Sequence, residues 1–441
     1  MKTQQTIPVG RAERAGEFLR TGAKIGVNYL KHYARQVSGT ESPRELLHED
    51  NARDVYQSLS KLKGSALKVA QMMSMDKAIL PRAYAEKFQM SQYSVPPLSA
   101  PLVIQTFRRS FGKGPDELYD AFSLSASNAA SIGQVHKAVK NGKPLAVKVQ
   151  YPGVAISIRS DLKMVKPFAT KLMGLNPADV ELYSTEVEAR LLEETDYELE
   201  LRRSVEISGA CSHLNDLLFP SYYPELSSRF ILTMDWLPGM HLNEFLQGNP
   251  SQEERDRAGQ ALWDFYEFQI HTLRQVHADP HPGNFLLQAD GRVGVIDFGC
   301  IKEIPETFYH PYFSLINPES IREESSTIKL FEALEFLHPS DGSSERRFFL
   351  PLFLRMISML GRPFQEKYFD FGNDDYFNGI YGFAEELAAM PEVRNSKKAR
   401  GSKDGLYINR TYFGLYSLLN QLKARVRTHS AFLGNSTQKT H

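Results

Sequence analysis

The spacing of apolar and polar residues changes several times along the chain, and each change marks an expected element. In residues 50–75 an apolar stripe with alternating steps of four and three residues predicts a long helix. Its members are Val55, Leu59, Leu62, Ala66, Val69 and Met73. A second stripe on this helix consists of Lys61, Gly64, Lys68 and Gln71. It fits either a solvated face or a face on which the glycine lets another backbone dock closely.

The first 36 residues are locally basic, with seven Lys or Arg residues against Glu13 and Glu17. An apolar repeat at helical spacing is formed by Phe18, Gly22, Ile25 and Tyr29. Such a segment is typical of a helix that lies on an anionic membrane surface, and equally of a helix packed on the protein's own body. The sequence leaves both interpretations open.

From about residue 120 the pattern becomes that of β-strands. Two short apolar runs flank "KNGKP", and the Asn141-Gly142 pair between them predicts a β-hairpin. Lys148 stands in the middle of the second run, "PLAVKVQ". Because a lysine is rarely buried without a partner, we expect Lys148 to meet an acid or a ligand.

Residues 185–204 contain neither glycine nor proline and are rich in acids, which predicts one helix. Glu193, Asp196 and Glu200 would then share a face. Since like charges repel, we expect a cation against them, from Lys148 or from the Lys61 and Lys68 stripe. The alternative is a solvated acidic face.

From about residue 250 the chain is expected to be mostly helical, apart from residues 275–300. Before it, residues 229–246 predict a strand, a Pro238-Gly239 turn and a helix. The most apolar run, from Phe348, is interrupted by Pro351 and Arg355 and is interpreted as a buried helix. The last predicted helix carries Leu415, Leu418, Leu419 and Leu422.

Composition narrows the class of protein. The 441 residues are 42% hydrophobic, enough for a sizeable core in one large domain or up to three ordinary ones. The 52 basic and 52 acidic residues cancel, so we expect no nucleic-acid partner. Cys211 and Cys300 are the two cysteines, which excludes a disulfide framework and favours a reducing compartment.

No signal-peptide pattern is present at the N-terminus, and no run approaches the ~20 apolar residues of a membrane span. We therefore expect a cytoplasmic protein without a transmembrane segment, with peripheral membrane association left open by the basic N-terminal segment.

Chemistry concentrates in "QVHADPHPGNFLLQADGRVGVIDFGC", residues 275–300. Two apolar runs are joined by Asp290-Gly291, which predicts a second hairpin. That hairpin would bring Asn284 near Asp297, with Asp279 in the loop just before. Such hard oxygen ligands suit Mg²⁺.

These residues also follow the order of the kinase pattern, in which a strand lysine precedes H-R-D-L-x-x-x-N and D-F-G. "HADPHPGN" supplies His277, Asp279 and Asn284, and "DFG" begins at Asp297. Lys148 fits the strand lysine, and Glu200 is the candidate helix partner. A glycine-rich phosphate loop is missing before Lys148, where "NAASIGQVH" stands instead.

With "KLKGSALKVAQ", "AVKVQYPG" and "EETDYELE", these motifs resemble the UbiB/AarF atypical protein-kinase-like family, called the ADCK group in animals. The resemblance covers roughly residues 50–300, and the "NRTYFGLYSLLNQLKA" tail is also similar. It implies a two-lobed α+β kinase-like fold. Residues 1–110 would form an N-terminal helical extension, 111–238 the N-lobe and 239–441 a largely helical C-lobe.

The same resemblance implies an ATPase-like enzyme that binds ATP or ADP with Mg²⁺. Typical protein phosphorylation is not expected, because the extension would occlude the substrate groove. The implied setting is isoprenoid quinone or other membrane-lipid metabolism. Besides the nucleotide, the implied partners are a membrane surface, a lipid or quinone intermediate, and lipid-biosynthesis enzymes.

Individual roles follow from the same family motifs. Lys148 would grip the phosphates with Glu200 as its partner, Asp279 would be the catalytic-loop acid, and Asn284 and Asp297 would hold the metal. The implied nucleotide contacts are Asn128, Ala129, Ala130, Ser131, Met234 and Leu237.

The family's K-x-G-Q motif falls on Lys68 to Gln71, and its E-x-D motif on Glu194 to Asp196, so the resemblance implies a regulatory Lys68–Glu194 pair. On a straight helix Glu194 and Glu200 point about 120° apart. Two departures, Ala70 in place of glycine and Asn128 in place of alanine, put regulation and nucleotide preference in question.

Three alternatives remain at the level of sequence. His277, Asp279 and His281 could bind a transition metal in a hydrolase. The chain could be a nucleotide-binding pseudoenzyme that scaffolds a lipid-biosynthesis complex, or a small-molecule phosphotransferase. Otherwise His277 is expected to brace the loop, His281 to reach the γ-phosphate, and Cys300 to be a small buried residue.

Overall fold

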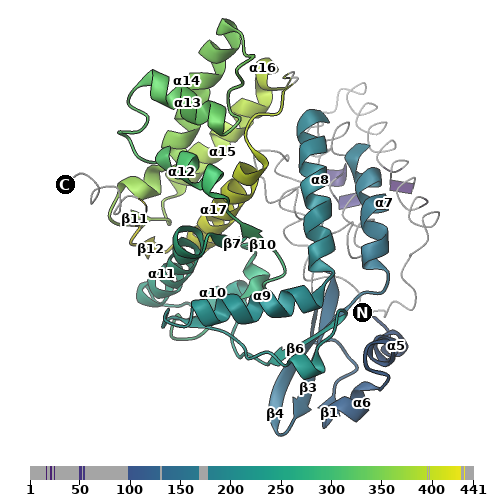
Figure 1. The fold of residues 1–441 in the computed structure, drawn as a ribbon. Coiled ribbons are helices and arrows are strands. Elements are labelled where there is room, and N and C mark those ends of the chain that lie inside the picture. The colour runs from purple at the N-terminus through teal and green to yellow at the C-terminus, as the bar shows by residue number, and fades with distance from the viewer. Residues whose placement is uncertain are drawn as a thin grey trace, which may run out of the picture. The chain divides into compact units, whose positions relative to one another are not determined.

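The computed structural model describes residues 98–129, 132–167, 177–394 and 398–428, with a few single residues elsewhere (Figure 1). The helix expected over 50–75, with Lys68, Ala70 and Gln71, lies almost entirely outside the described residues, as do Ala130 and Ser131. The chain divides into two compact units. Unit 1 comprises Met1–Val205, Pro220–Trp236 and Ala388–Asn395, and unit 2 comprises Glu206–Phe219, Leu237–Leu387 and Ser396–His441.

Unit 1 is built on a five-stranded antiparallel sheet. The strand order is β1-β3-β4-β6, with β2 also paired to β3. The strands are β1 (Ala121–Phe122), β2 (Asn128–Ala129), β3 (Gly133–Lys140), β4 (Lys143–Gln150) and β6 (Ile231–Asp235).

The predicted hairpin between β3 and β4 is confirmed. Asn141 and Gly142 form its turn with φ of 51° and 74°. Positive φ at both central residues is the type I′ geometry that Asn-Gly favours.

The core of unit 1 joins this sheet to a helix that precedes it. Helix α5 (Ala100–Phe111) buries Val103 and Phe107, both 0% exposed, together with Val147 and Val149 of β4. A short helix α6 (Pro115–Leu118) follows α5, and the 3₁₀ turn η3 (Pro224–Leu226) precedes β6. Because successive side chains of a strand point to opposite faces, this core packs against the sheet face opposite the one that carries Lys148.

Three longer helices follow β4: α7 (Val154–Pro167), α8 (Pro177–Glu194) and α9 (Tyr197–Ala210). The single helix predicted over 185–204 is wrong, because the chain breaks at Thr195 and Asp196. The Asp196 carboxylate accepts the backbone N–H groups of Glu198 at 3.1 Å and Leu199 at 3.0 Å. An aspartate that caps a helix in this way competes with continued helix, and α9 leaves the break in a different direction from α8 (Figure 1).

Unit 2 contains three small sheets. β5 (Leu217–Leu218), β9 (Val293–Val295) and β8 (Phe285–Leu287) form one, in that order. β7 (Gln275–His277) pairs with β10 (Ile301–Glu303), and β11 (Phe369–Asp370) with β12 (Arg425–Val426). The second predicted hairpin is confirmed, since β8 and β9 are antiparallel with Phe285 opposite Val295.

Helices make up most of unit 2, as expected. They are α10 (Leu242–Gln247), α11 (Gln252–Phe268), α12 (Glu306–Ser314), α13 (Glu324–Ala333), α14 (Ser343–Leu360), α15 (Asp374–Ala389, whose last residues belong to unit 1) and α17 (Lys403–Leu422). Short turns are the π-helical η4 (Gln269–Leu273) and the 3₁₀ turns η5 (Pro282–Asn284) and η6 (Arg362–Gln365), while α16 (Pro391–Arg394) belongs to unit 1.

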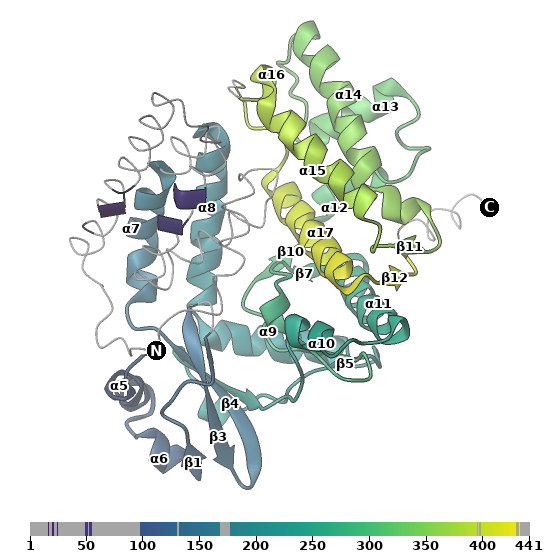
Figure 2. The same ribbon diagram turned by 180° about the vertical axis from the view of Figure 1, so that it is seen from behind.

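The core of unit 2 lies between α11 and α17, which pack together in both views (Figure 1 and Figure 2). Trp263 of α11 stacks on Tyr416 of α17 with ring centroids 6.4 Å apart. The four leucines predicted to line the last helix are all buried. The expected buried helix, α14, is buried along one face only. Its Arg355 lies outside that face and pairs with Glu386. Within the described ranges, no helix combines the length and the apolar character needed to cross a bilayer.

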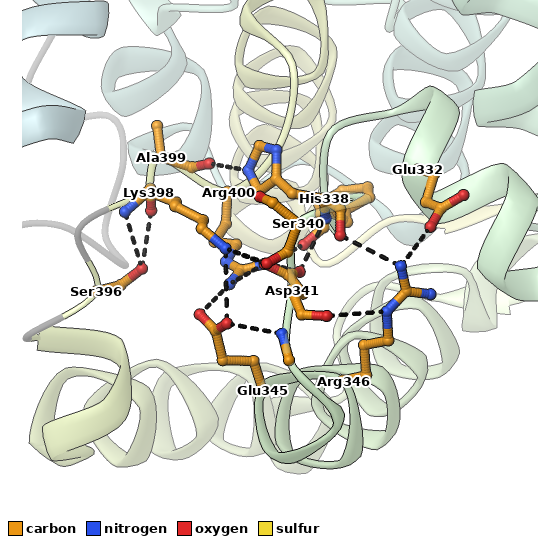
Figure 3. A network of polar contacts seen from close by, with 12 residues as sticks. Glu332, His338, Ser340, Asp341, Glu345, Arg346, Ser396, Lys398, Ala399 and Arg400 are labelled. Carbon is orange, nitrogen blue, oxygen red and sulfur yellow. Dashed lines mark hydrogen bonds and ion pairs between the residues drawn. The ribbon is translucent and has the colours of Figure 1, made fainter.

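A buried ion network secures the segment before α17 (Figure 3). The Asp341 side chain is 0% exposed and lies 2.6 Å from Lys398 Nζ and 2.5 Å from an Arg400 guanidinium nitrogen. The backbone N–H of His338 donates to the same carboxylate at 2.8 Å, and the half-exposed Glu345 contacts both cations from further away. The network thus ties residues 398–400 to the turn between α13 and α14.

Candidate functional site

The strand lysine of unit 1 has the acidic partner that the sequence predicts. Lys148 lies in the centre of β4, opposite Val135 of β3 and Leu232 of β6. Its Nζ is 2.5 Å from Glu200 Oε1, and the two side chains are 7% and 4% exposed. The break before α9 changes the helix direction, so the straight-helix angle between Glu194 and Glu200 does not apply to this chain.

The other acids of this segment do not form the shared acidic face that we expected, because each has its own partner. Glu193 pairs with Arg190 of α8 at 2.9 Å and with Arg203 of α9 at 2.8 Å. Asp196 caps α9. Glu194 ends α8 and is 5% exposed, but its expected partner Lys68 lies outside the described residues, so the Lys68–Glu194 pair stays a prediction.

The buried Lys148–Glu200 pair leads to a stability prediction. Lys148→Met should lower the free energy of unfolding by about 3 kcal/mol, the lower end for a broken buried pair, because the stranded Glu200 can take up a proton. Lys148→Met with Glu200→Met should recover most of that loss, since no buried charge remains. Urea unfolding of the three proteins measures this. A double variant no more stable than the single one would contradict it.

Three of the expected nucleotide contacts, Asn128, Ala129 and Met234, lie in strands of the same sheet as Lys148. Asn128 and Ala129 form β2, where Asn128 pairs with Val135. Gly133 begins β3, and a Cβ there would lie 2.5 Å from the Val149 carbonyl oxygen, so this approach requires glycine. Met234 is buried in β6, and Leu237 begins the next stretch of unit 2 after Trp236. Their nucleotide roles stay predictions.

Unit 2 brings together the second group of expected site residues. The Asn284 side-chain NH₂ donates to the Asp279 carbonyl oxygen at 2.8 Å. The backbone N–H of Ile296 donates to the Asn284 carbonyl at 3.1 Å, so Asp297 follows directly beside Asn284. Asp297 Oδ1 accepts the N–H of Gly299 at 2.9 Å, which fixes that carboxylate. The hairpin therefore assembles these residues as predicted.

The two histidines of this loop, His277 and His281, both hydrogen-bond to nearby residues. The buried His277 ring lies 3.3 Å from the Tyr266 hydroxyl, and its backbone N–H donates to Gln269 Oε1 at 2.9 Å. His281 Nδ1 accepts the N–H of Gly283 at 2.9 Å. Among the described residues, no group of three or more His, Cys, Asp or Glu side chains is arranged to hold a metal.

Sequence reasoning missed one face of α17, which lies along the loop that carries Asp279. Arg410, 4% exposed, points its guanidinium to Asp279 Oδ1 at 3.4 Å. One turn later, a Cβ on Gly414 would lie 2.2 Å from Pro280 Cγ, so only glycine allows this contact. Tyr407 packs with Ala278 and Cys300, the latter a small buried residue as predicted. The signal was a lone arginine within an apolar, aromatic helix.

Gln269 was missed as well. It is fully buried in the π-helical turn η4, and its side-chain NH₂ donates to the Phe265 carbonyl at 3.1 Å while its carbonyl accepts from His277. π-Helical turns often accompany functional sites. No local pattern in the sequence marks this one.

The chain as a whole is similar to several known proteins. Residues 90–329 match the model of the ABC1 atypical kinase-like domain. The chain is 26% identical over 444 residues to atypical kinase COQ8B, mitochondrial, of Danio rerio, covering 98% of this chain and 69% of that protein. It is 25% identical over 455 residues to the probable serine/threonine-protein kinase abkA of Dictyostelium discoideum, covering 97% and 79%. A solved complex of Rv3197 with erythromycin from Mycobacterium tuberculosis is similar with a TM-score of 0.58 and 26% identity, over 87% of this chain and 95% of that one.

Proposed function

Because this chain belongs to the ABC1 atypical kinase-like family, we propose that it binds ATP with Mg²⁺ and hydrolyses it, in support of isoprenoid quinone or other membrane-lipid metabolism. Membership confirms the UbiB/AarF resemblance, the kinase-like α+β fold and an atypical kinase-like enzyme. The observation that carries the nucleotide proposal is the buried Lys148–Glu200 ion pair at 2.5 Å. A scaffold without nucleotide chemistry would gain little from it, because burying such a pair is commonly no more stable than burying apolar residues.

In this proposal Glu200 holds the Lys148 ammonium so that it meets the nucleotide phosphates. A lysine oriented by a glutamate is one of the recurring parts of phosphoryl-transfer sites in kinases. Lys148 stands in β4 between Val147 and Val149, which are both 0% exposed, so the core holds the backbone that carries the lysine. This rigidity supports a positioning role.

The second group suits a hard divalent cation. Since the Asn284 NH₂ is used by the Asp279 carbonyl, its Oδ1 remains the atom offered to a metal. Asp297 supplies the carboxylate, and Mg²⁺ completes its shell with water and phosphate oxygens. When bound, the ion would neutralise phosphate charge, while Asp279 orients the attacking water or hydroxyl.

The membrane-lipid part of the proposal rests on family resemblance and on the basic residues 1–36. The similarity to atypical kinase COQ8B, a mitochondrial protein, supports it. The pseudoenzyme scaffold and the small-molecule phosphotransferase remain the competing proposals, and they differ in what happens to the γ-phosphate.

Thermal melting with and without MgATP tests the site. At about 100 times the dissociation constant, MgATP should stabilise the protein by about 2.7 kcal/mol, which raises Tm by several degrees. We expect this shift in the parent protein and its loss in Asp297→Asn. No shift in a folded parent protein at millimolar MgATP would reject nucleotide binding.

Phosphate release then separates the competing functions. Hydrolysis without an acceptor supports the ATPase. Binding without release, with or without lipid vesicles, favours the scaffold. Transfer of labelled phosphate to a small acceptor favours the phosphotransferase.

A further inference from the structure

A separate pocket lies within unit 2, between α12, α14 and α17. Described residues of these three helices and of the segments beside them line it, and it opens to solvent at its mouth. Seven of its fourteen lining residues are aromatic. Of the residues proposed to bind nucleotide or metal, none that the structure describes lines it.

The walls of this pocket are apolar and uncharged. Phe313, Leu315 and Tyr416 are each no more than 3% exposed. Among the described residues that line the pocket, none carries a charge. Burial raises the pKa of Tyr312 and of Tyr416, so both phenols stay neutral. A charged ligand would find no counter-ion here and would pay for its lost hydration.

One polar group faces the pocket with hydrogen-bonding capacity to spare. The Asn409 carboxamide oxygen accepts from the Tyr312 hydroxyl, which orients the amide. Its NH₂ group makes no hydrogen bond to any residue that the structure describes and is left as a donor. The Tyr416 hydroxyl, in contrast, is used by the Leu360 carbonyl at 3.1 Å. The Asn409 NH₂ group can therefore donate to an acceptor atom of a ligand.

We propose that this pocket binds a small uncharged molecule with an apolar body and one carbonyl or ether oxygen. The neutral aromatic walls exclude a charge, and the Asn409 amide selects an acceptor. The proposal does not depend on nucleotide binding, because the pocket is lined by other described residues than Lys148, Asp279, Asn284 and Asp297.

A matched pair of probes tests the class of ligand. Benzophenone and diphenylmethane have the same two rings, but only benzophenone has a carbonyl. Calorimetry with the whole chain should show benzophenone binding about three- to tenfold tighter, the range of one neutral hydrogen bond. In Asn409→Leu the two probes should bind equally. Equal binding to the parent protein, or no binding of either probe, would overturn the proposal.

Photolabelling locates the site. Under irradiation the benzophenone oxygen takes a hydrogen atom from a nearby C–H bond, and the two carbon radicals then join to give a C–C-linked tertiary alcohol. Mass spectrometry should place this label on Met356 or adjacent wall residues. Ile357→Phe, which fills the pocket, should abolish the label, whereas Ser358→Phe on the exposed side of α14 should not. Labelling elsewhere that is unchanged in Ile357→Phe would refute the location.

Discussion

Asp341→Asn is expected to lower the free energy of unfolding by about 5 kcal/mol, the upper end for a broken buried ion pair. The reason is that the variant leaves the Lys398 and Arg400 cations facing a neutral amide (Figure 3). The Arg400 side chain is 9% exposed, and a guanidinium does not lose its proton, so the buried charge remains. Urea unfolding of the whole chain measures the loss.

Glu345→Gln is the matched control. Glu345 contacts the same two cations at 3.5 Å and 3.3 Å, but its side chain is 45% exposed. Exposed pairs contribute about 0–1 kcal/mol because water screens them. An Asp341→Asn loss no larger than that of Glu345→Gln would show that the network does not stabilise unit 2.

The same carboxylate gives the stability a pH dependence. Burial alone would raise the pKa of Asp341, but hydrogen bonds from Arg400, the His338 N–H and Lys398 bring it well below its ordinary value. A carboxyl whose pKa is lowered by folding stabilises the protein above its unfolded pKa of about 4, and this stabilisation is lost as pH falls below that value. We therefore expect the unfolding free energy to drop more steeply between about pH 4 and pH 2 in the parent protein than in Asp341→Asn.

The sequence predicted the features that depend on a few neighbouring residues, above all the two hairpin turns. The Asn141-Gly142 and Asp290-Gly291 hairpins follow from turn residues whose φ preferences act within four residues. Lys148 was predictable because a charge within an apolar strand demands a partner, although its partner Glu200 is 52 residues away. The family motifs, not the periodicity, selected Glu200 among several acids.

The failures have physical causes too. The break at Asp196 was missed because helical periodicity ignores the competition between capping and continued helix. The contacts Arg410–Asp279 and Arg400–Asp341 join residues 131 and 59 positions apart, and no local pattern records such a pairing. Both depend on how α17 packs, which is decided by the whole core of unit 2.

The largest change in rate is expected at Asp279, the residue that Arg410 of α17 contacts. If the proposed ATPase chemistry holds, Asp279→Asn should reduce phosphate release by about 10²–10⁴-fold, because the group that orients or deprotonates the attacking water is lost. MgATP should still raise Tm, since Asn284 and Asp297 remain. Such a split between binding and turnover is the signature of a residue that acts on the chemical step.

We expect Arg410 to position Asp279 for this chemistry, and a double-mutant cycle tests that role. Its guanidinium, 3.4 Å from Asp279, holds the carboxylate from a helix that Gly414 lets approach Pro280. Arg410→Met should slow phosphate release by about 10-fold or more with MgATP binding retained, and Arg410→Lys should restore part of the rate by returning a cation. Because Arg410 acts through Asp279, Arg410→Met should cause little further loss in an Asp279→Asn background. Additive losses in the double variant would mean that Arg410 acts elsewhere, and an unchanged rate in Arg410→Met would mean that the contact has no part in the reaction.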